Sequence, residues 1–401
     1  MGTWRKANPR FAALALILLA ATVGCSSSTY TWPPSSKSPG AAVTPAASAV
    51  HVDVPSSAQP VASASAAPRE TSGSATVDNI TAGFTWKSSL ITPLAHLYGT
   101  FLDAFVIVTI DNSNTSPVKV VVSSVINDYT DTATDTVTVP ANGNQEVRQN
   151  PRLTTAAIDG LNSEHQADLH VTVSYLQAGE PKLVLDQTRQ TLVTSRRDFP
   201  WSIKGFTQFE NYQLVVAMIT PSDPSVEQLI RVAADYDPSG QMASGYESTN
   251  DYDGSVSQRL SDVWQAEATD YKLTYISTPI TFASGSSQRI RLPGEVLDGA
   301  SGNCIELTLL YASVVEALGM QAALVLVPGH AYIAVRVDDQ NDNYYFIETT
   351  LIGQTTFDNA LTYGLSEWTK DSTGVHNGDS DYGWIDVETA RAKGIVPIPW
   401  R

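Results

Sequence analysis

The sequence contains only two cysteines, Cys25 and Cys304, among 401 residues. Two cysteines so far apart exclude a disulfide framework and a cysteine-based zinc cluster, so each needs its own explanation. Basic residues are also scarce, because 24 Lys and Arg face 41 Asp and Glu and the formal net charge is −17. No Lys- or Arg-rich run interrupts that acidity, so we expect no nucleic-acid partner.

Charged residues are few overall, at 16%, whereas hydrophobic residues make up 42% of the chain. This composition favours a well-supplied core with a hydroxyl- and amide-rich surface, so most of the chain should fold. The length suggests two or three domains.

The N-terminus has the pattern of an export signal. Basic residues precede an apolar run from residue 11 to residue 23, which is too short to span a membrane. Gly24-Cys25 after such a run resembles a bacterial lipobox, in which the cysteine is acylated. We predict a signal peptide over 1–24 and a lipid anchor at Cys25, which holds the exported protein at the outer face of a bacterial membrane. An ordinary secretory signal and an uncleaved short anchor are the alternatives.

Residues 25–75 are expected to form a disordered tether. From residue 26 to residue 75 the chain has 13 Ser, 11 Ala and 7 Pro and no apolar period. Such a segment buries too little surface to offset chain entropy. A coil of this length spans about 40 Å, which would hold the folded part clear of the membrane.

Residues 76–199 have the sequence pattern of an all-β domain, in which runs of β-branched residues are separated by clusters of turn-forming residues. Short strands at this spacing indicate a sandwich similar to immunoglobulin-like or fibronectin-like modules. The expected strands are 104–110, 118–126, 135–139, 169–175 and 183–193.

Residues 200–401 change to a helical period followed by strands, which indicates an α+β domain. Asp223-Pro224 is typical of a helix start, and a buried helix is expected from Cys304 to Leu318, ended by Gly319. After it we expect the strands 322–327, 331–337 and 344–350.

Cys304 opens that buried helix. Unpaired backbone N–H groups and the helix dipole favour an anion at this position, so a thiolate would be stabilised and nucleophilic there. The alternative is an inert buried thiol, which is common for a free cysteine.

His330 and Glu348 lie on two strands that a turn over 338–343 should fold together. If the numbers of paired residues add up to 678–680, Glu348 faces His330 directly or on the same-face diagonal. A shift of a single residue would separate them. The three residues then match cysteine acyl transfer, with Cys304 as nucleophile, His330 as general base and acid, and Glu348 as the orienting acid.

Acyl transfer also needs donors for the oxyanion. The backbone N–H of Cys304 is one candidate, and the second is left open between Gln288 and Tyr275. We expect no metal and no other cofactor, since the acidic loop around Asp379 has Tyr382 where a calcium loop needs glycine.

The segments Gly302-Asn303-Cys304, Gly329-His330-Ala331 and 347–350 together resemble the transglutaminase-like superfamily, in particular its exported bacterial branch. The resemblance covers about half of the chain, from residue 200 onward. It implies a papain-like fold and the three catalytic roles given above. The acid of the family is usually Asp followed by Pro, whereas this chain has Glu348 followed by Thr.

The expected function is therefore a membrane-tethered extracytoplasmic cysteine enzyme. It would cleave or transfer amide acyl groups through a thioester on Cys304, on cell-envelope protein or peptidoglycan peptides. A noncatalytic surface binding or adhesion module on the same fold is the alternative from another class, and a cross-linking transglutaminase is the alternative among enzymes.

Overall fold

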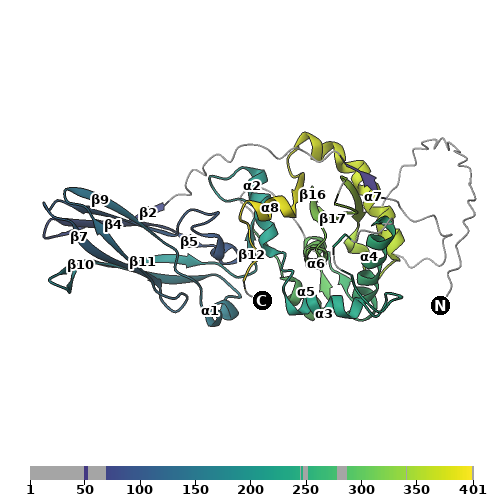
Figure 1. Ribbon diagram of the computed structural model, residues 1–401, viewed down its shortest axis with the longest axis horizontal. Helices are drawn as coiled ribbons and strands as arrows, with labels where there is room; N and C mark the ends of the chain where they lie inside the picture. Colours follow the sequence, from purple (N-terminus) through teal and green to yellow (C-terminus); the bar gives the residue numbers. More distant parts are fainter. Residues whose placement is uncertain are drawn as a thin grey trace, which may run out of the picture. The chain divides into compact units, whose positions relative to one another are not determined.

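The computed structural model describes residues 49–52, 69–243, 245–246, 252–277, 287–339 and 341–399, which all belong to one compact unit. The predicted signal peptide and Cys25 lie outside these residues, as does most of the predicted tether. The described chain has a β-rich part followed by a mixed part with helices and an antiparallel sheet (Figure 1). The fold is thus α+β.

The β-rich part contains two five-stranded sheets that are antiparallel except where β5 runs parallel to β11. One sheet has the order β5 (Ser89–Leu90), β11 (Glu180–Val193), β10 (His165–Gln177), β7 (Val118–Ile126) and β8 (Ala133–Val139). The other has β2 (Arg69–Thr71), β4 (Ile80–Lys87), β6 (Val106–Asn112) and β9 (Gly143–Gln149), with β3 (Ala75–Val77) also paired to β4.

Alternation of apolar and polar side chains forms the core of this part. In β6, Val106, Val108 and Ile110 are fully buried, and the residues between them face outward or are half-buried. Val120 and Val122 of β7 repeat the pattern on the other sheet. Since successive side chains in a strand point to opposite faces, each sheet contributes one apolar face.

Each of the five expected strands has a counterpart, but the long strands β4 and β9 were missed, as were the short strands β2, β3 and β5. β4 reads Ile-Thr-Ala-Gly-Phe-Thr-Trp-Lys, in which Ala82 and Gly83 break the β-branched run, and β9 is mostly polar. Both are nevertheless held in place, because β6 pairs with β4 on one side and β9 on the other. Partners far along the chain overrode weak local preference.

The predicted tether limit at residue 75 was wrong, because β2 (Arg69–Thr71) and the first residue of β3 already pair with β4. A second correction concerns β1 (Val50–His51), which lies within the segment expected to be disordered. It pairs antiparallel with β18 (Asn343–Ile347), and Val52 is buried with its N–H 2.7 Å from the Asp342 carbonyl. The free edge of β18 offers unpaired backbone groups, which a short extended segment can satisfy.

The mixed part is built on a five-stranded sheet of order β1-β18-β17-β16-β19. Its remaining strands are β17 (His330–Arg336), β16 (Ala322–Val327) and β19 (Gly383–Asp386). The longer helices are α3 (Pro224–Ala233), α4 (Tyr252–Thr269), α6 (Cys304–Ala317) and α7 (Phe357–Asn377). Short elements complete it: α2 (Gln208–Gln213), η2 (Leu214–Met218), α5 (Pro293–Asp298), η3 (Thr349–Leu351) and α8 (Val387–Ala392).

Three expectations about helices agree with the structure. Asp223 caps α3 and Pro224 is its first residue. The buried helix α6 begins at Cys304, and Gly319 follows its end with a φ of +70°. That left-handed conformation is one that glycine adopts without steric cost.

The sheet has two differently covered faces. Helix α6 covers one face of the sheet by packing on β16 and β17. Helices α3 and α5 also contact α6 (Figure 1). Helix α7 packs on β18, where Tyr332, Phe346 and Trp384 form part of a separate aromatic core. The sheet is therefore buried on both faces, which explains the almost continuous apolar runs of its strands.

The expected domain boundary between residues 199 and 200 falls inside β12 (Asp198–Pro200), which pairs with β14 (Ser287–Arg289). The preceding residue, Arg197, also forms an ion pair with Glu295 of α5 at 2.7 Å. One hydrophobic core runs through both parts. The two parts are thus continuous rather than separated by a linker.

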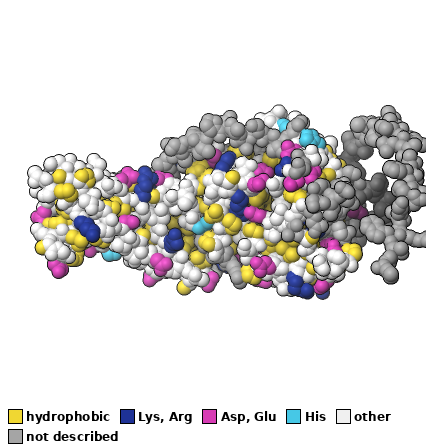
Figure 2. All heavy atoms as spheres, in the orientation of Figure 1, with side chains coloured by type: hydrophobic (Ala, Val, Ile, Leu, Met, Phe, Trp, Pro, Cys, Tyr) yellow, Lys and Arg dark blue, Asp and Glu magenta, His cyan; other side chains and the backbone are white. Residues whose placement is uncertain are grey.

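On the face shown in Figure 2, Lys and Arg side chains are scattered singly among neutral and acidic ones. Within the described ranges, no helix has the length and apolar character needed to cross a bilayer.

Candidate active site

The position of Cys304 is set by a capping box at the start of α6. The side-chain oxygen of Asn303 accepts the N–H of Glu306 at 3.0 Å, and a carboxylate oxygen of Glu306 accepts the N–H of Asn303 at 3.1 Å. This reciprocal pair satisfies two backbone donors that a helix start leaves open. The helix therefore begins at Cys304 rather than a residue earlier or later.

Glu306 is itself fixed by Arg291. The guanidinium of Arg291 donates to Glu306 at 3.1 and 2.8 Å, and its backbone N–H donates to the same carboxylate at 2.9 Å. The hydrogen bonds to Glu306 raise the pKa of Arg291. A bidentate pair holds its geometry better than a single contact, so the start of α6 is rigidly placed.

His330 and Glu348 come together as the sequence predicted. Ile333 lies opposite Ile347, which is the register whose paired numbers add up to 680. Extended along the two strands, this register puts Glu348 on the same-face diagonal from His330. The imidazole Nε2 lies 2.7 Å from Oε2 of Glu348.

The expected strand 344–350 was too long, because β18 ends at Ile347 and Glu348 caps η3. Glu348 is completely buried. Its Oε1 accepts the N–H of Thr350 at 3.0 Å and the Thr350 hydroxyl at 2.5 Å, while its Oε2 faces His330. Each carboxylate oxygen thus has a partner, so the acid is held in one orientation.

Thr350 is a supporting residue that the sequence analysis did not identify. Glu is not among the residues that are favoured at helix starts, so no local pattern pointed to this contact. A further link joins the elements, since the hydroxyl of Thr308 on α6 donates to the Ala331 carbonyl and lies 3.3 Å from the Thr349 hydroxyl. These contacts tie α6 to β17 and η3.

The side chain of Cys304 acts on the pKa of His330, so the thiol belongs to the same group of side chains. Since Nε2 of the ring faces Glu348, Nδ1 is the nitrogen left for the thiol. Burial by itself would lower the pKa of His330, but the Glu348 carboxylate and the nearby Cys304 side chain outweigh it and raise the pKa to about 11. The arrangement therefore favours a charged imidazolium at neutral pH.

Access to the sulfur is limited. Cys304 is 1% exposed, whereas the side chain of His330 is 23% exposed. A reagent or substrate would approach from the imidazole side.

The two candidate oxyanion donors lie in separate two-stranded sheets. Tyr275 of β13 (Thr274–Tyr275) pairs with Gly302 of β15 (Ser301–Gly302), two residues before Cys304. Gln288 lies on β14, where its side-chain oxygen accepts the indole N–H of Trp201 at 3.0 Å. The amide nitrogen of Gln288 is buried and has no hydrogen-bond partner, so it retains an unused donor.

Further buried polar groups lie on the same face of β17 as His330. The ring of Tyr332 lies 6.1 Å from that of His330, and the Tyr332 hydroxyl has no hydrogen-bond partner. Asp371 of α7 is also buried with one free carboxylate oxygen, and burial raises its pKa. The charge of His330 acts in the opposite direction on Asp371, so this acid is electrostatically linked to the ring.

No cluster of His, Cys, Asp and Glu suited to a metal ion occurs within the described residues. The acidic loop near Asp379 includes Asp381, whose carboxylate lies near Gln208 and Tyr212 of α2 at 3.4 and 3.5 Å. Those contacts are to protein groups, in keeping with an acidic surface loop.

Comparisons with known proteins do not assign a family. No protein-family model and no curated protein matches the chain. Similar solved structures include a crystal structure of a protein from Archaeoglobus fulgidus, with a TM-score of 0.19 and 8% identity over 32% of this chain and 95% of that one. Another is a solution structure of a protein described as late embryogenesis abundant (LEA), with a TM-score of 0.18 and 6% identity over 32% and 72%. Scores this low do not establish a shared fold, so the site is interpreted from its own geometry.

Proposed function

We propose that this protein is a cysteine-dependent enzyme that cleaves or transfers the acyl group of a carboxamide. The observation that carries the proposal is the 2.7 Å contact between His330 and the buried Glu348, with Cys304 acting on the same ring from the start of α6. A thiol at a helix start, a ring that it influences and a buried acid that orients the ring are the parts that nucleophilic acyl transfer needs.

In the proposed mechanism the Cys304 thiolate attacks the amide carbon. The charged His330 gives its proton to the leaving nitrogen, which leaves a thioester on the sulfur. The neutral ring then takes a proton from water, whose oxygen attacks the thioester carbon and releases a carboxylic acid. Glu348 keeps the ring in place throughout and stabilises its charged form.

The oxyanion of each tetrahedral intermediate needs hydrogen-bond donors. The backbone N–H of Cys304 supplies the first in this proposal. Gln288 is favoured over Tyr275 as the second, since its side-chain nitrogen is an unused donor whereas the contact of β13 with β15 involves backbone groups.

The finer fold assignment belongs to the same proposal. The sequence segments around Cys304, His330 and Glu348 resemble the transglutaminase-like superfamily with its papain-like fold, and the order helix, strand, strand is compatible with it. For the β-rich part, the two sheets are compatible with an immunoglobulin-like or fibronectin-like sandwich.

The proposed location is the outer face of a bacterial membrane, with Cys25 carrying the lipid. Substrates reachable there are cell-envelope proteins and peptidoglycan peptides. Hydrolysis is the favoured outcome, because water greatly outnumbers amines unless the protein provides an amine site.

A noncatalytic binding module remains the second candidate, and one observation favours it. Cys304 is 1% exposed, which is typical of an inert structural thiol.

Thiol labelling distinguishes the two candidates. In a Cys25→Ser background Cys304 is the single thiol, and iodoacetamide uptake can be followed by mass spectrometry from pH 5 to pH 9. An activated pair should label at nearly constant rate below pH 8, whereas an ordinary thiol should slow about tenfold for each pH unit. Labelling only after unfolding in urea would support the binding module.

Activity provides the second test. Peptide-amide hydrolysis should be lost in Cys304→Ala while the circular dichroism spectrum is unchanged, and Ser225→Ala on α3 is a matched control away from the site. Incorporation of a labelled primary amine into an acceptor protein would identify transfer rather than hydrolysis. Full activity in Cys304→Ala would contradict the enzymatic proposal.

A further inference from the structure

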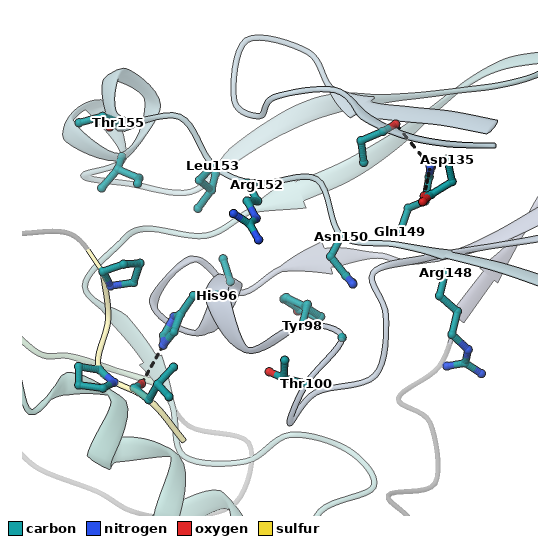
Figure 3. A pocket seen from close by; sticks show the side chains of 17 residues that line it. His96, Tyr98, Thr100, Asp135, Arg148, Gln149, Asn150, Arg152, Leu153 and Thr155 are labelled. Carbon is teal, nitrogen blue, oxygen red and sulfur yellow. Dashed lines mark hydrogen bonds between the residues drawn. The ribbon is translucent and has the colours of Figure 1, made fainter. Parts of the chain in front are cut away.

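A second polar site lies in the β-rich part, where a cavity of about 630 Å³ opens beside the end of β9 (Figure 3). One wall is the segment from Arg148 to Leu153, and another is formed by η1 (Thr92–Leu97) and the turn that follows it. The chain end near Val396 closes a third side, and its carbonyl lies 3.0 Å from Nε2 of His96. The volume is in the range of small-molecule sites.

Arg152 is an unpaired cation on this cavity. It is exposed, and no hydrogen bond or ion pair of its guanidinium involves any residue in the described ranges. Arg148, by contrast, is paired with Asp103 at 2.7 Å and Glu146 at 2.8 Å. In a chain with a net charge of −17, a guanidinium that forms no ion pair with the described residues is available for an external anion.

Asn150 supplies a second donor. Its side-chain oxygen accepts the N–H of Phe105 at 2.8 Å, which fixes the amide and leaves its nitrogen on the cavity side (Figure 3). That nitrogen occupies the space of a missing side chain, because a Cβ on Gly99 would lie 2.2 Å from it. Gly99 has a φ of +83°, so glycine is needed there for both space and conformation.

Gln149 supplies an acceptor. It is 2% exposed, and its nitrogen donates to Val122 and Asp135 at 3.1 and 2.9 Å. Its side-chain oxygen is buried without a partner, although the residue lines the cavity. A buried carbonyl without a donor is costly, so an N–H from outside would satisfy it.

The lining also includes apolar residues, with Leu153, Ile158, Val396 and Pro397 among them. A lone small anion would leave these surfaces and the acceptor unused. The last residue of a peptide with a free C-terminus combines a carboxylate, a backbone N–H and, where that residue is apolar, an apolar side chain. We propose that this cavity binds the C-terminal carboxylate of a peptide whose last residue is apolar, with Arg152 and Asn150 contacting the carboxylate.

The proposal is independent of catalysis, so it is tested on full-length protein that carries Cys304→Ala. The probe is the tripeptide Ala-Ala-Leu with fluorescein on its amine, and binding is followed by anisotropy. We expect saturable binding. The same peptide with a C-terminal amide should bind at least about tenfold more weakly, since a hydrogen bond to a charged group is lost.

Two variants should reproduce that loss. Arg152→Met removes the charge, and Asn150→Asp keeps the acceptor for Phe105 while replacing the donor by a carboxylate oxygen. Each should weaken binding at least about tenfold. Arg231→Met is the matched control, because Arg231 is an exposed arginine on α3, and it should leave binding unchanged.

The proposal is overturned if the probe shows no saturable binding, if acid and amide bind equally, or if Arg152→Met binds as well as the parent protein. Competition by acetate at the same concentration as the peptide would show recognition of any anion and would likewise contradict it. Loss of hydrolysis has no bearing on these outcomes, so failure here and failure of the enzymatic proposal are separable.

Discussion

The candidate active site and the β-domain cavity use hydrogen bonds in opposite ways. Around Cys304, the carboxylates of Glu306 and Glu348 have partners within the chain at both oxygens. Around the cavity, Arg152 has no partner among the described residues and the oxygen of Gln149 has none. A satisfied network fixes positions, whereas unsatisfied groups on a cavity wall are available to a ligand.

Substitutions at the two sites should therefore have different effects. A change within the satisfied network should lower stability, activity or both. It leaves a buried polar group with neither a protein partner nor water to hydrogen-bond. A change on the cavity wall should cost binding alone. Four measurements test the comparison, in decreasing order of expected effect.

Glu348→Gln should have the largest effect. It keeps the size of the side chain but offers His330 the wrong hydrogen-bonding partner, so amide hydrolysis should fall about 10⁴-fold. Steady-state kinetics would show the change in kcat. Glu227→Gln on α3, where the carboxylate is exposed, is the control and should retain full activity. Equal activity in both variants would remove Glu348 from the mechanism.

Glu306→Gln should mainly affect stability. The variant leaves the guanidinium of Arg291 without its carboxylate and weakens the cap of α6, so the free energy of unfolding should fall by about 3 kcal/mol. Urea unfolding followed by tryptophan fluorescence measures it. Glu227→Gln is the control, and the midpoint of its urea unfolding curve should be unchanged. A small change in the unfolding free energy would mean that the capping box of Asn303 and Glu306 does not hold the start of α6.

The pH dependence of stability tests the charge on His330. Its folded-state pKa of about 11 lies above the ordinary value of 6.5, so its contribution is fully present below pH 6.5 and is lost as pH rises toward 11. With Cys304 kept in place, the unfolding free energy should decline over that window, by no more than about 1.4 kcal/mol per pH unit for one proton. Adding His330→Gln should flatten the profile, and an unchanged slope would contradict the charged ring.

Arg152→Met should have the smallest effect on stability. The side chain is exposed and unpaired within the described residues, so the unfolding free energy should change by less than about 0.5 kcal/mol. Thermal unfolding measured beside the peptide titration gives both values. A large loss of stability would show that the guanidinium has a structural role and would blur the contrast between the two sites.

Much of the candidate site could be predicted from local pattern. The helix start at Cys304 follows from the cap residues and the apolar run behind it, and the strand of His330 follows from its β-branched residues after Pro328-Gly329. The pairing with Glu348 was predicted only on condition that the numbers of paired residues add up to 678–680, and the sum in the structure is 680. Local pattern overextended β18, because nothing in its composition shows that the chain turns at Glu348 into η3.

The strands that the sequence did not predict have a common feature. β1, β4 and β9 have weak strand propensity or lie in a segment of Ser, Ala and Pro, and each is held by a partner far along the chain. The cavity shows the same limit, since its walls come from segments near residues 96, 150 and 396. No window of sequence contains such a combination.

The sequence by itself determined the acidic character, the alternation that buries each strand face, and the start of the helix that carries Cys304. These are local matters, set by side-chain period and by capping within a few residues. Only the tertiary structure decided that Glu348 has both oxygens occupied, that the Arg152 guanidinium forms no ion pair with the described residues, and that Val50 and His51 extend a sheet. Each depends on which distant groups reach one another in space, and backbone and side-chain hydrogen bonds can be assigned only when those neighbours are known.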